Sequence, residues 1–318
     1  MYRIIFIVFV KLILLLGLFN STIASSCGIQ SIKPIINQPR FLNADQSVAN
    51  SWPWTVAIFY QENNENFYVC SGSLVSTQHV LTTAQCTKKL PRNGNIFVNA
   101  GSHYLTQINN LKNRRYVSII HQHHNLNQHE NDIALLKLSH PFNLNYKIQT
   151  ICLPAFKDID LVYGKNLVVT GWGSTNGKRD PSAFSHSLQQ TSVKLLNFFN
   201  NTVCKGYDLK MYCGVGMANS NPCYGDTGSG LMHEIKGRWY LYGMVSFSSA
   251  VIRNNQVICD SKSPAYFTMV PKHVEWIYSK MNLNLKVPYQ KSNPKITPNP
   301  NSIQKYIINK NVFLAGLI

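Results

Sequence analysis

Between residues 54 and 138, short apolar runs alternate with turns that contain Asn, Gly and Gln. The runs are rich in Val, Ile, Thr, Phe and Tyr, and no long stretch has helical periodicity. Closely spaced short strands of this kind are typical of an all-β barrel or sandwich. We expect these strands at Thr55–Tyr60, Phe67–Val75, Val80–Thr83, Ile96–Ala100 and Tyr116–His121.

A second set of strand-like runs follows, and Lys236-Gly237 predicts a hairpin turn within it. The last periodic segment, Pro271–Tyr278, has apolar residues at helical spacing and predicts a C-terminal helix. The strands of the second set are expected at Leu167–Gly171, Gln189–Leu196, Met211–Val215, Leu231–Ile235, Trp239–Phe247 and Ala265–Val270.

The first 24 residues have the pattern of a secretory signal peptide. Arg3 precedes an apolar run from Ile4 to Phe19, which Lys11 interrupts, and small residues up to Ala24 are suited to cleavage. An uncleaved anchor is the alternative, but the run is short for a membrane span. The sequence therefore predicts a secreted, extracellular protein.

The C-terminal segment, residues 282–318, is rich in Asn, Lys and Pro and predicts a basic, flexible tail. Its last apolar run, Val312–Ile318, is too short to cross a membrane, so we expect no membrane span. The sequence indicates no oligomeric state.

The formal net charge of the chain is +17. Without Arg3, Lys11 and the five lysines after Met281, the central region has a net charge of about +10. Such a field attracts polyanions, including glycosaminoglycans, although a secreted protein can also have a high isoelectric point without such a partner. No motif for specific nucleic-acid recognition, no cofactor motif and no metal constellation is indicated.

Five motifs in order resemble those of the chymotrypsin/trypsin family of serine proteases. The segment Cys223–Gly230 is similar to the family's nucleophile turn, in which glycines direct two backbone N–H groups at a developing oxyanion. The others match the segments that carry the family's histidine, its aspartate, the start of its second barrel and its substrate-binding strand. They are Cys70–Leu74 with His79–Cys86, Asn131–Leu136, Thr170–Gly173 and Val245–Phe247.

This resemblance implies an all-β fold of two six-stranded antiparallel barrels, the trypsin-like double barrel, with a C-terminal helix over residues 41–281. Residues 25–40 would be a propeptide-like segment. In active members, cleavage after a basic residue frees an N-terminus that inserts beside the aspartate preceding the nucleophile. Arg40, Phe41 and Asp226 match these positions, but Phe41–Ala44 replaces the usual Ile-Val-Gly-Gly, so this route of activation stays open.

Eight cysteines remain after the signal segment, an even number that is typical of disulfides in an oxidising compartment. The resemblance implies four bonds, one of which would tether the propeptide-like segment to the body. Asn200 begins an Asn-Asn-Thr sequence and is a possible glycosylation acceptor. The implied disulfide pairs are Cys27–Cys152, Cys70–Cys86, Cys204–Cys213 and Cys223–Cys259.

Two of the three catalytic positions are substituted. Gln85 stands where the family has its histidine, Thr227 stands at the serine, and Asp132 is retained. A neutral amide cannot take up a proton near pH 7, although it can donate an N–H to Asp132. Threonine is activated in some enzymes by an adjacent amine, but none is apparent here, and its methyl group restricts the first side-chain torsion. The oxyanion hole would be formed by the N–H groups of Gly225 and Thr227.

The residues at the positions of the specificity pocket are uncharged, and two of them would make the pocket narrower. Asn221 stands where trypsin-like members have an aspartate, and Ser248 and Ala265 occupy wall positions that are glycine in open pockets. Ser246 completes the set on the substrate-binding strand. The resemblance therefore implies a pocket that does not select Lys or Arg.

Other histidines are possible substitutes for the missing base. His79 lies too far along its strand to reach the position of Gln85. His121, His123, His124 and His129 precede Asp132 and could bind a metal or act as a base, but a polar surface loop is the favoured interpretation.

We therefore expect a secreted serine protease homologue without peptidase activity that acts as a binding or regulatory protein. Its partner would be a protein or a glycosaminoglycan-like polyanion. The alternatives are an active endopeptidase that uses Thr227 with a displaced base, and a regulator that competes for the substrates or inhibitors of active proteases. Candidate polyanion contacts are Lys88, Lys89, Arg92, Lys112, Arg114 and Arg115.

Overall fold

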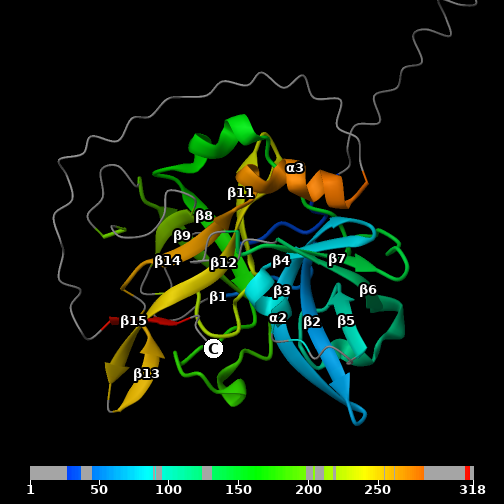
Figure 1. Ribbon diagram of the computed structural model, residues 1–318, viewed down its shortest axis with the longest axis horizontal. Coiled ribbons are helices and arrows are strands. Elements are labelled where there is room, and N and C mark those ends of the chain that lie inside the picture. Colours follow the sequence, from blue (N-terminus) through cyan, green and yellow to red (C-terminus); the bar gives the residue numbers. More distant parts are fainter. Residues whose placement is uncertain are drawn as a thin grey trace, which may run out of the picture.

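The computed structural model describes most of the region between residues 27 and 282 and one short segment near the C-terminus. Two β-barrels make up the body of the protein, and a helix lies beside them (Figure 1). The described ranges are 27–36, 45–88, 90, 95–123, 131–197, 203–204, 211–217, 220–253, 255–260, 262–282 and 312–315.

The first barrel is closed, and all of its strand pairs are antiparallel. Around the barrel, the strands are β2 (Thr55–Glu62), β3 (Glu65–Ser76), β4 (His79–Thr82), β7 (Ala134–Leu138), β6 (Arg114–Gln122) and β5 (Asn95–Ala100). Its connections contain α2 (Ala84–Lys88), η1 (Gln107–Asn109) and η2 (Leu111–Asn113).

The second barrel is closed by the pairing of β8 with β9. Around the barrel, the strands are β8 (Asn166–Gly171), β9 (Gln189–Leu195), β10 (Met211–Gly216), β14 (Ala265–Met269), β12 (Arg238–Arg253) and β11 (Gly230–Ile235). Three further strands attach to it: β1 (Asp45–Gln46) pairs with β9, whereas β13 (Gln256–Cys259) and β15 (Val312–Ala315) pair with β12. The short helices η4 (Phe156–Val162) and η5 (Pro181–Ala183) lie in its connections, and α3 (Val270–Lys280) follows β14.

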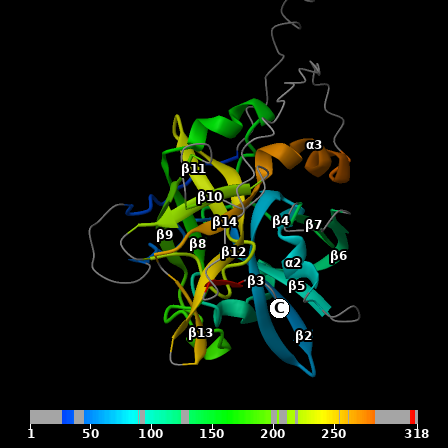
Figure 2. The same ribbon diagram turned by 60° about the vertical axis from the view of Figure 1, so that its left-hand side comes forward.

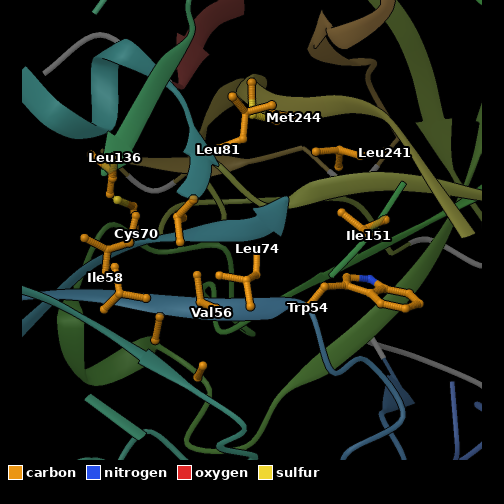
Figure 3. Packing of buried hydrophobic residues seen from close by; sticks show 14 of the residues in the cluster. Trp54, Val56, Ile58, Cys70, Leu74, Leu81, Leu136, Ile151, Leu241 and Met244 are labelled. Carbon is orange, nitrogen blue, oxygen red and sulfur yellow. The ribbon is translucent and has the colours of Figure 1, made fainter. Parts of the chain in front are cut away.

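One hydrophobic cluster joins the two barrels. Trp54, directly before β2, and Leu74 on β3 are fully buried, as are Leu241 and Met244 on β12 (Figure 3). The rings of Trp52 and Trp239 meet edge to face with centroids 4.7 Å apart, close to this junction. Burying this much aromatic and aliphatic surface fixes the barrels against each other, so side chains from both can meet in one site.

The structure confirms the double-barrel fold with its C-terminal helix. Each strand expected from the hydrophobic pattern is present, and the helix begins at Val270. Two differences matter for the site. β12 continues six residues beyond Phe247, as a hairpin with β13, and residues 312–315 of the predicted tail form β15.

Four disulfide bonds join the cysteine pairs that the resemblance implies. Cys27–Cys152 holds the first described segment against the second barrel, and hydrogen bonds of Gly28 reinforce it. Its N–H donates to the carbonyl of Thr150 (2.7 Å), and its carbonyl accepts from the N–H of Trp239 (2.9 Å).

Candidate active site

Asp132 lies where the two barrels meet, just before β7, and is almost completely buried. One carboxylate oxygen accepts the backbone N–H of Gln85 (2.7 Å), and the other accepts the hydroxyl of Ser246 on β12 (2.6 Å). Its backbone carbonyl accepts the hydroxyl of Thr268 on β14 (2.8 Å). Asp132 is thus fixed from both barrels, since Gln85 belongs to the first and the two hydroxyls belong to the second.

The side chain of Gln85 is partly buried on α2, and its backbone makes the bond to Asp132. Within the described ranges, its carbonyl oxygen Oε1 is buried and has no hydrogen-bond partner. The sequence suggested that the side-chain amide could donate to Asp132, but the hydrogen bond that the structure shows comes from the main chain. The amide leaves this position without a group that can accept a proton at neutral pH.

Thr227 sits on a tight double turn between β10 and β11. The N–H of Asp226 donates to the carbonyl of Cys223 (3.0 Å), and the N–H of Ser229 donates to the carbonyl of Asp226 (2.9 Å). The turn is pressed against β3, where the carbonyl of Thr227 accepts the N–H of Ser71 (3.1 Å). The turn of Thr227, which belongs to the second barrel, is therefore held against β3 of the first barrel.

Two glycines make this turn possible. Gly225 and Gly228 have φ angles of +89° and +83°, a region that side chains disfavour. A β-carbon at Gly228 would also lie 2.2 Å from the carbonyl oxygen of Ser71. In the part of the chain that the structure describes, the N–H groups of Gly225 and Thr227 donate to no acceptor. Both are therefore unused within the turn, as an oxyanion hole requires.

Tyr68 is a contact of the turn that the sequence did not predict. Its buried hydroxyl donates to the carbonyl of Gly225 (2.8 Å) and lies 3.0 Å from the hydroxyl of Ser71. Burial raises the pKa of this phenol, so it stays protonated and can act as a donor. Its position two residues before Cys70, on the strand that faces the turn, is the one signal that could have identified it.

Asp226 points away from Thr227, back toward β8. Its carboxylate accepts the N–H groups of Cys223 and Gly173, each at 2.9 Å. A β-carbon at Gly173 would lie 2.2 Å from this carboxylate, so only glycine fits there. Burial raises the pKa of Asp226 to about 6, although the two backbone donors lower it.

A cavity of about 410 Å³ lies beside this carboxylate. Asp226, Gly173, Gln190 and Asn221 are among the residues that line it. An anionic group beside a cavity of this size can receive a cationic end of the chain, which is the arrangement that insertion of a new N-terminus would need. Arg40 and Phe41, where the cut was expected, lie outside the described residues.

The residues expected to form the specificity pocket lie close together and are hydrogen-bonded or paired with neighbouring segments. The hydroxyl of Ser248 donates to the carbonyl of Pro222 (2.6 Å), and the amide of Asn221 donates to the carbonyl of Ser263 (2.7 Å). Ala265 is completely buried, and Ser246 is bonded to Asp132. None of these four side chains carries a charge.

The contacts shown for His79 and His123 are with residues other than Gln85. His79 contacts the hydroxyl of Ser76 (2.9 Å), and the ring of His123 packs 5.5 Å from the ring of Trp276 on α3. Burial and the nearby Lys280 and Lys137 lower the pKa of His121. No group of three metal-ligating side chains gathers within these ranges, and His124 and His129 lie outside them.

The side chains of the candidate polyanion contacts differ in their exposure and in the contacts that they make. Arg114 stacks over the ring of Phe97 at 4.0 Å, and Arg115 lies over Phe142 at 4.7 Å, with both guanidinium groups bonded to backbone carbonyls. Lys112 is exposed beside them, and Lys88 is exposed at the end of α2. Lys89, Arg92 and Asn200 lie outside the described residues, as does the expected signal peptide.

Comparison with known proteins agrees with this geometry. The chain matches the family described as Trypsin over residues 41–277. It is 32% identical to mouse (Mus musculus) chymotrypsin-C over 274 residues, which cover 82% of this chain and 95% of that protein. No helix within the described ranges is long and apolar enough to cross a membrane. The double barrel, the arrangement around Asp132 and these matches together establish that the chain belongs to the trypsin family of serine proteases.

Proposed function

We propose that this trypsin-family protein does not hydrolyse peptide bonds and that it acts by binding a partner. The observation that carries the proposal is the position of Gln85. Its backbone N–H donates to Asp132, but its side chain offers an amide where the family has the histidine that acts as the base. Peptide hydrolysis by this constellation needs a group that removes the proton from the nucleophile.

The surroundings of Thr227, the residue at the nucleophile position, support the same conclusion. The hydrogen bonds shown for histidine side chains in the described ranges join residues other than Thr227, so none of these bonds activates its hydroxyl. Loss of one member of a triad lowers turnover on the order of 10⁶-fold, and loss of a second adds little, because the members act as one unit. The N–H groups of Gly225 and Thr227 would still bind a carbonyl oxygen, and that binding is compatible with a noncatalytic role.

We propose an extracellular location for this activity. Four disulfide bonds are stable in an oxidising compartment, and the N-terminal apolar segment has the pattern of a secretory signal.

A paired reversion tests the loss of catalysis. We would compare the parent with Gln85→His, Thr227→Ser and the double variant, using a fluorophosphonate probe and a small ester substrate. Each protein would be assayed before and after limited cleavage at Arg40. An inert parent and an active double variant, whose activity disappears on adding Asp132→Ala, would support the proposal. Hydrolysis by the parent that Thr227→Ala abolishes would overturn it.

Polyanion binding is a second candidate, because the chain carries a net charge of +17 and Lys112 is exposed beside Arg114 and Arg115. Since the two arginines are bonded to the barrel, their substitution would disturb the fold, and Lys112→Glu is the cleaner variant. Elution from immobilised heparin should then need less salt. Lys165→Glu, the same charge change at an exposed site on the other barrel, is the matched control. Equal shifts for both variants would count against a specific site.

A further inference from the structure

A second cavity, of about 380 Å³, lies where three distant parts of the chain meet. These parts are the first described segment with its disulfide, the beginning of β12, and α3. Figure 1 and Figure 2 show α3, in orange, in the upper part of the molecule, where it contacts β12 and η4. We call this space the Arg238 cavity, and the residues that line it are Cys27, Cys152, Leu153, Arg238, Tyr240 and Tyr278.

Backbone hydrogen bonds fix the walls of the Arg238 cavity. The N–H of Cys152 donates to the carbonyl of Trp239 (3.1 Å), and the N–H of Leu241 donates to the carbonyl of Cys152 (2.9 Å). Side chains alternate between the two faces of a strand, so Arg238 and Tyr240 of β12 lie on the same face. Both therefore line the cavity, while Trp239 between them is buried.

Arg238 places a positive charge in the wall of the cavity. Its guanidinium Nη1 donates to the carbonyl of Cys27 (3.2 Å), which orients the group. Among the described residues that line the cavity, Arg238 is the one cation and there is no carboxylate. A planar guanidinium binds a carboxylate through two parallel N–H···O bonds. The charge of this cavity thus suits a carboxylate ligand.

The other lining groups suit a ligand with an apolar body. Leu153 and the sulfur atoms of the disulfide form an apolar surface, and the rings of Tyr240 and Tyr278 add to it. Tyr278 is partly buried, and burial raises the pKa of its hydroxyl, which therefore remains a hydrogen-bond donor at neutral pH. The volume lies in the range of about 300–1,000 Å³ that is usual for small-molecule sites.

We propose that the Arg238 cavity binds a small organic acid, a carboxylate on an aromatic or short aliphatic body. The carboxylate would accept hydrogen bonds from Arg238 and Tyr278, and the apolar body would pack against Leu153 and the disulfide. The net charge of +17 favours an anion over a neutral ligand of the same shape. The cavity and the candidate active site share no lining residue, so the proposal does not depend on the loss of catalysis.

Titration of the full-length protein with p-fluorobenzoate, followed by fluorine NMR at pH 7, tests the role of the charge. The parent should bind this probe saturably, and Arg238→Gln should bind it at least tenfold more weakly. Arg253→Gln removes the same charge from an exposed position at the other end of β12 and should bind as the parent does. Because both variants have the same net charge, a difference between them isolates the position of the arginine.

Tyr278→Phe provides a test that leaves the bond between Arg238 and Cys27 in place. It removes one donor and keeps the ring, so p-fluorobenzoate should bind at least threefold more weakly. Tyr116→Phe, at an exposed tyrosine on β6, is the matched control and should leave binding unchanged. If Arg238→Gln fails to fold, this pair of variants still decides the question.

Two further probes separate the charge of the ligand from its apolar body. The neutral p-fluorobenzamide and the small anion acetate should each bind the parent at least tenfold more weakly than p-fluorobenzoate. The proposal would be overturned by three results: no saturable binding, equal binding by Arg238→Gln and Arg253→Gln, or acetate that binds as tightly as p-fluorobenzoate. None of these readouts uses catalysis, so failure here is distinct from failure of the proposed loss of activity.

Discussion

Ser248 on β12 and Pro222, which precedes the nucleophile turn, are joined directly by a 2.6 Å hydrogen bond between hydroxyl and carbonyl. The two residues lie in the opposite walls of the expected specificity pocket. Ser248 is nearly inaccessible, so the bond is shielded from water. A side chain that entered between these walls would have to break this hydrogen bond, and we therefore expect the bond to close the pocket.

We predict that Ser248→Ala loosens this closure. The variant leaves the carbonyl of Pro222 without its donor, which should lower the free energy of unfolding by about 1–2 kcal/mol. It should also admit a small neutral aromatic amide, because the opposing Asn221 carries no charge. Urea denaturation measures the first effect, and titration with benzamide measures the second.

Ser249→Ala is the matched control for this prediction. The hydroxyl of Ser249 is also buried and donates to a proline carbonyl, that of Pro264, at 3.0 Å. Its loss should cost a similar free energy of unfolding without opening the pocket. Benzamide binding that is as strong in the parent as in Ser248→Ala would contradict the assigned closure.

Asp226 makes the stability of the uncleaved chain depend on pH. Burial raises its pKa from 3.8 to about 6. Between about pH 4 and pH 6 the folded chain keeps a proton that the unfolded chain has lost, so the free energy of unfolding falls as pH rises. Since a tenfold change in an ionisation equilibrium is worth about 1.4 kcal/mol, the full loss is on the order of 3 kcal/mol.

Urea denaturation at pH 4, 5, 6 and 7 measures this loss. The contribution should be complete below pH 4 and gone above pH 6, and Asp226→Asn should remove this part of the pH dependence. A slope that is identical in Asp226→Asn would show that another group titrates.

Gly228 should be the glycine least tolerant of substitution in the turn. Gly228→Ala would combine an unfavourable φ of +83° with a β-carbon 2.2 Å from the carbonyl oxygen of Ser71. Gly237 in the β11–β12 hairpin has a similar φ of +77° but open space around it. We expect Gly237→Ala to cost about 1 kcal/mol and Gly228→Ala at least about 2 kcal/mol more, measured by urea denaturation. Equal costs would mean that the turn can move away from β3.

Tyr68→Phe should loosen the nucleophile turn while leaving the barrels intact. It removes the donor to the carbonyl of Gly225, at a cost of about 1 kcal/mol, and should speed hydrogen exchange at residues 224–228. Tyr116→Phe, at an exposed tyrosine on β6, is the control and should change neither. Unchanged exchange in Tyr68→Phe would argue that other contacts hold the turn.

The strands and the disulfide pairs could be predicted because their signals are local or carried by motifs. β7 (Ala134–Leu138) was not expected as a strand, because most of it was interpreted only as part of the aspartate motif Asn131–Leu136. The closed barrel shows that this segment is a buried strand, which pairs with β4 on one edge and with β6 on the other.

The contacts of the candidate site were harder to foresee. The sequence brought Gln85 and Asp132 together, but it could not show that the main chain, and not the amide, makes the bond. The bond between Ser248 and Pro222 depends on the path of a turn, and the stacking of Arg114 on Phe97 depends on two neighbouring strands. The register of β15 on β12 joins segments that are distant in the sequence, where no local pattern can specify the partner.

The Cys27–Cys152 bond determines what a cut after Arg40 would leave behind. The N-terminal piece would remain joined to the rest of the protein by this disulfide bond. Gly28 would stay hydrogen-bonded to Thr150 and Trp239. The product would be a two-chain molecule, which gives a single band on a non-reducing gel and releases a small fragment only on reduction. Processing would therefore create a new chain end without releasing the N-terminal piece from the protein.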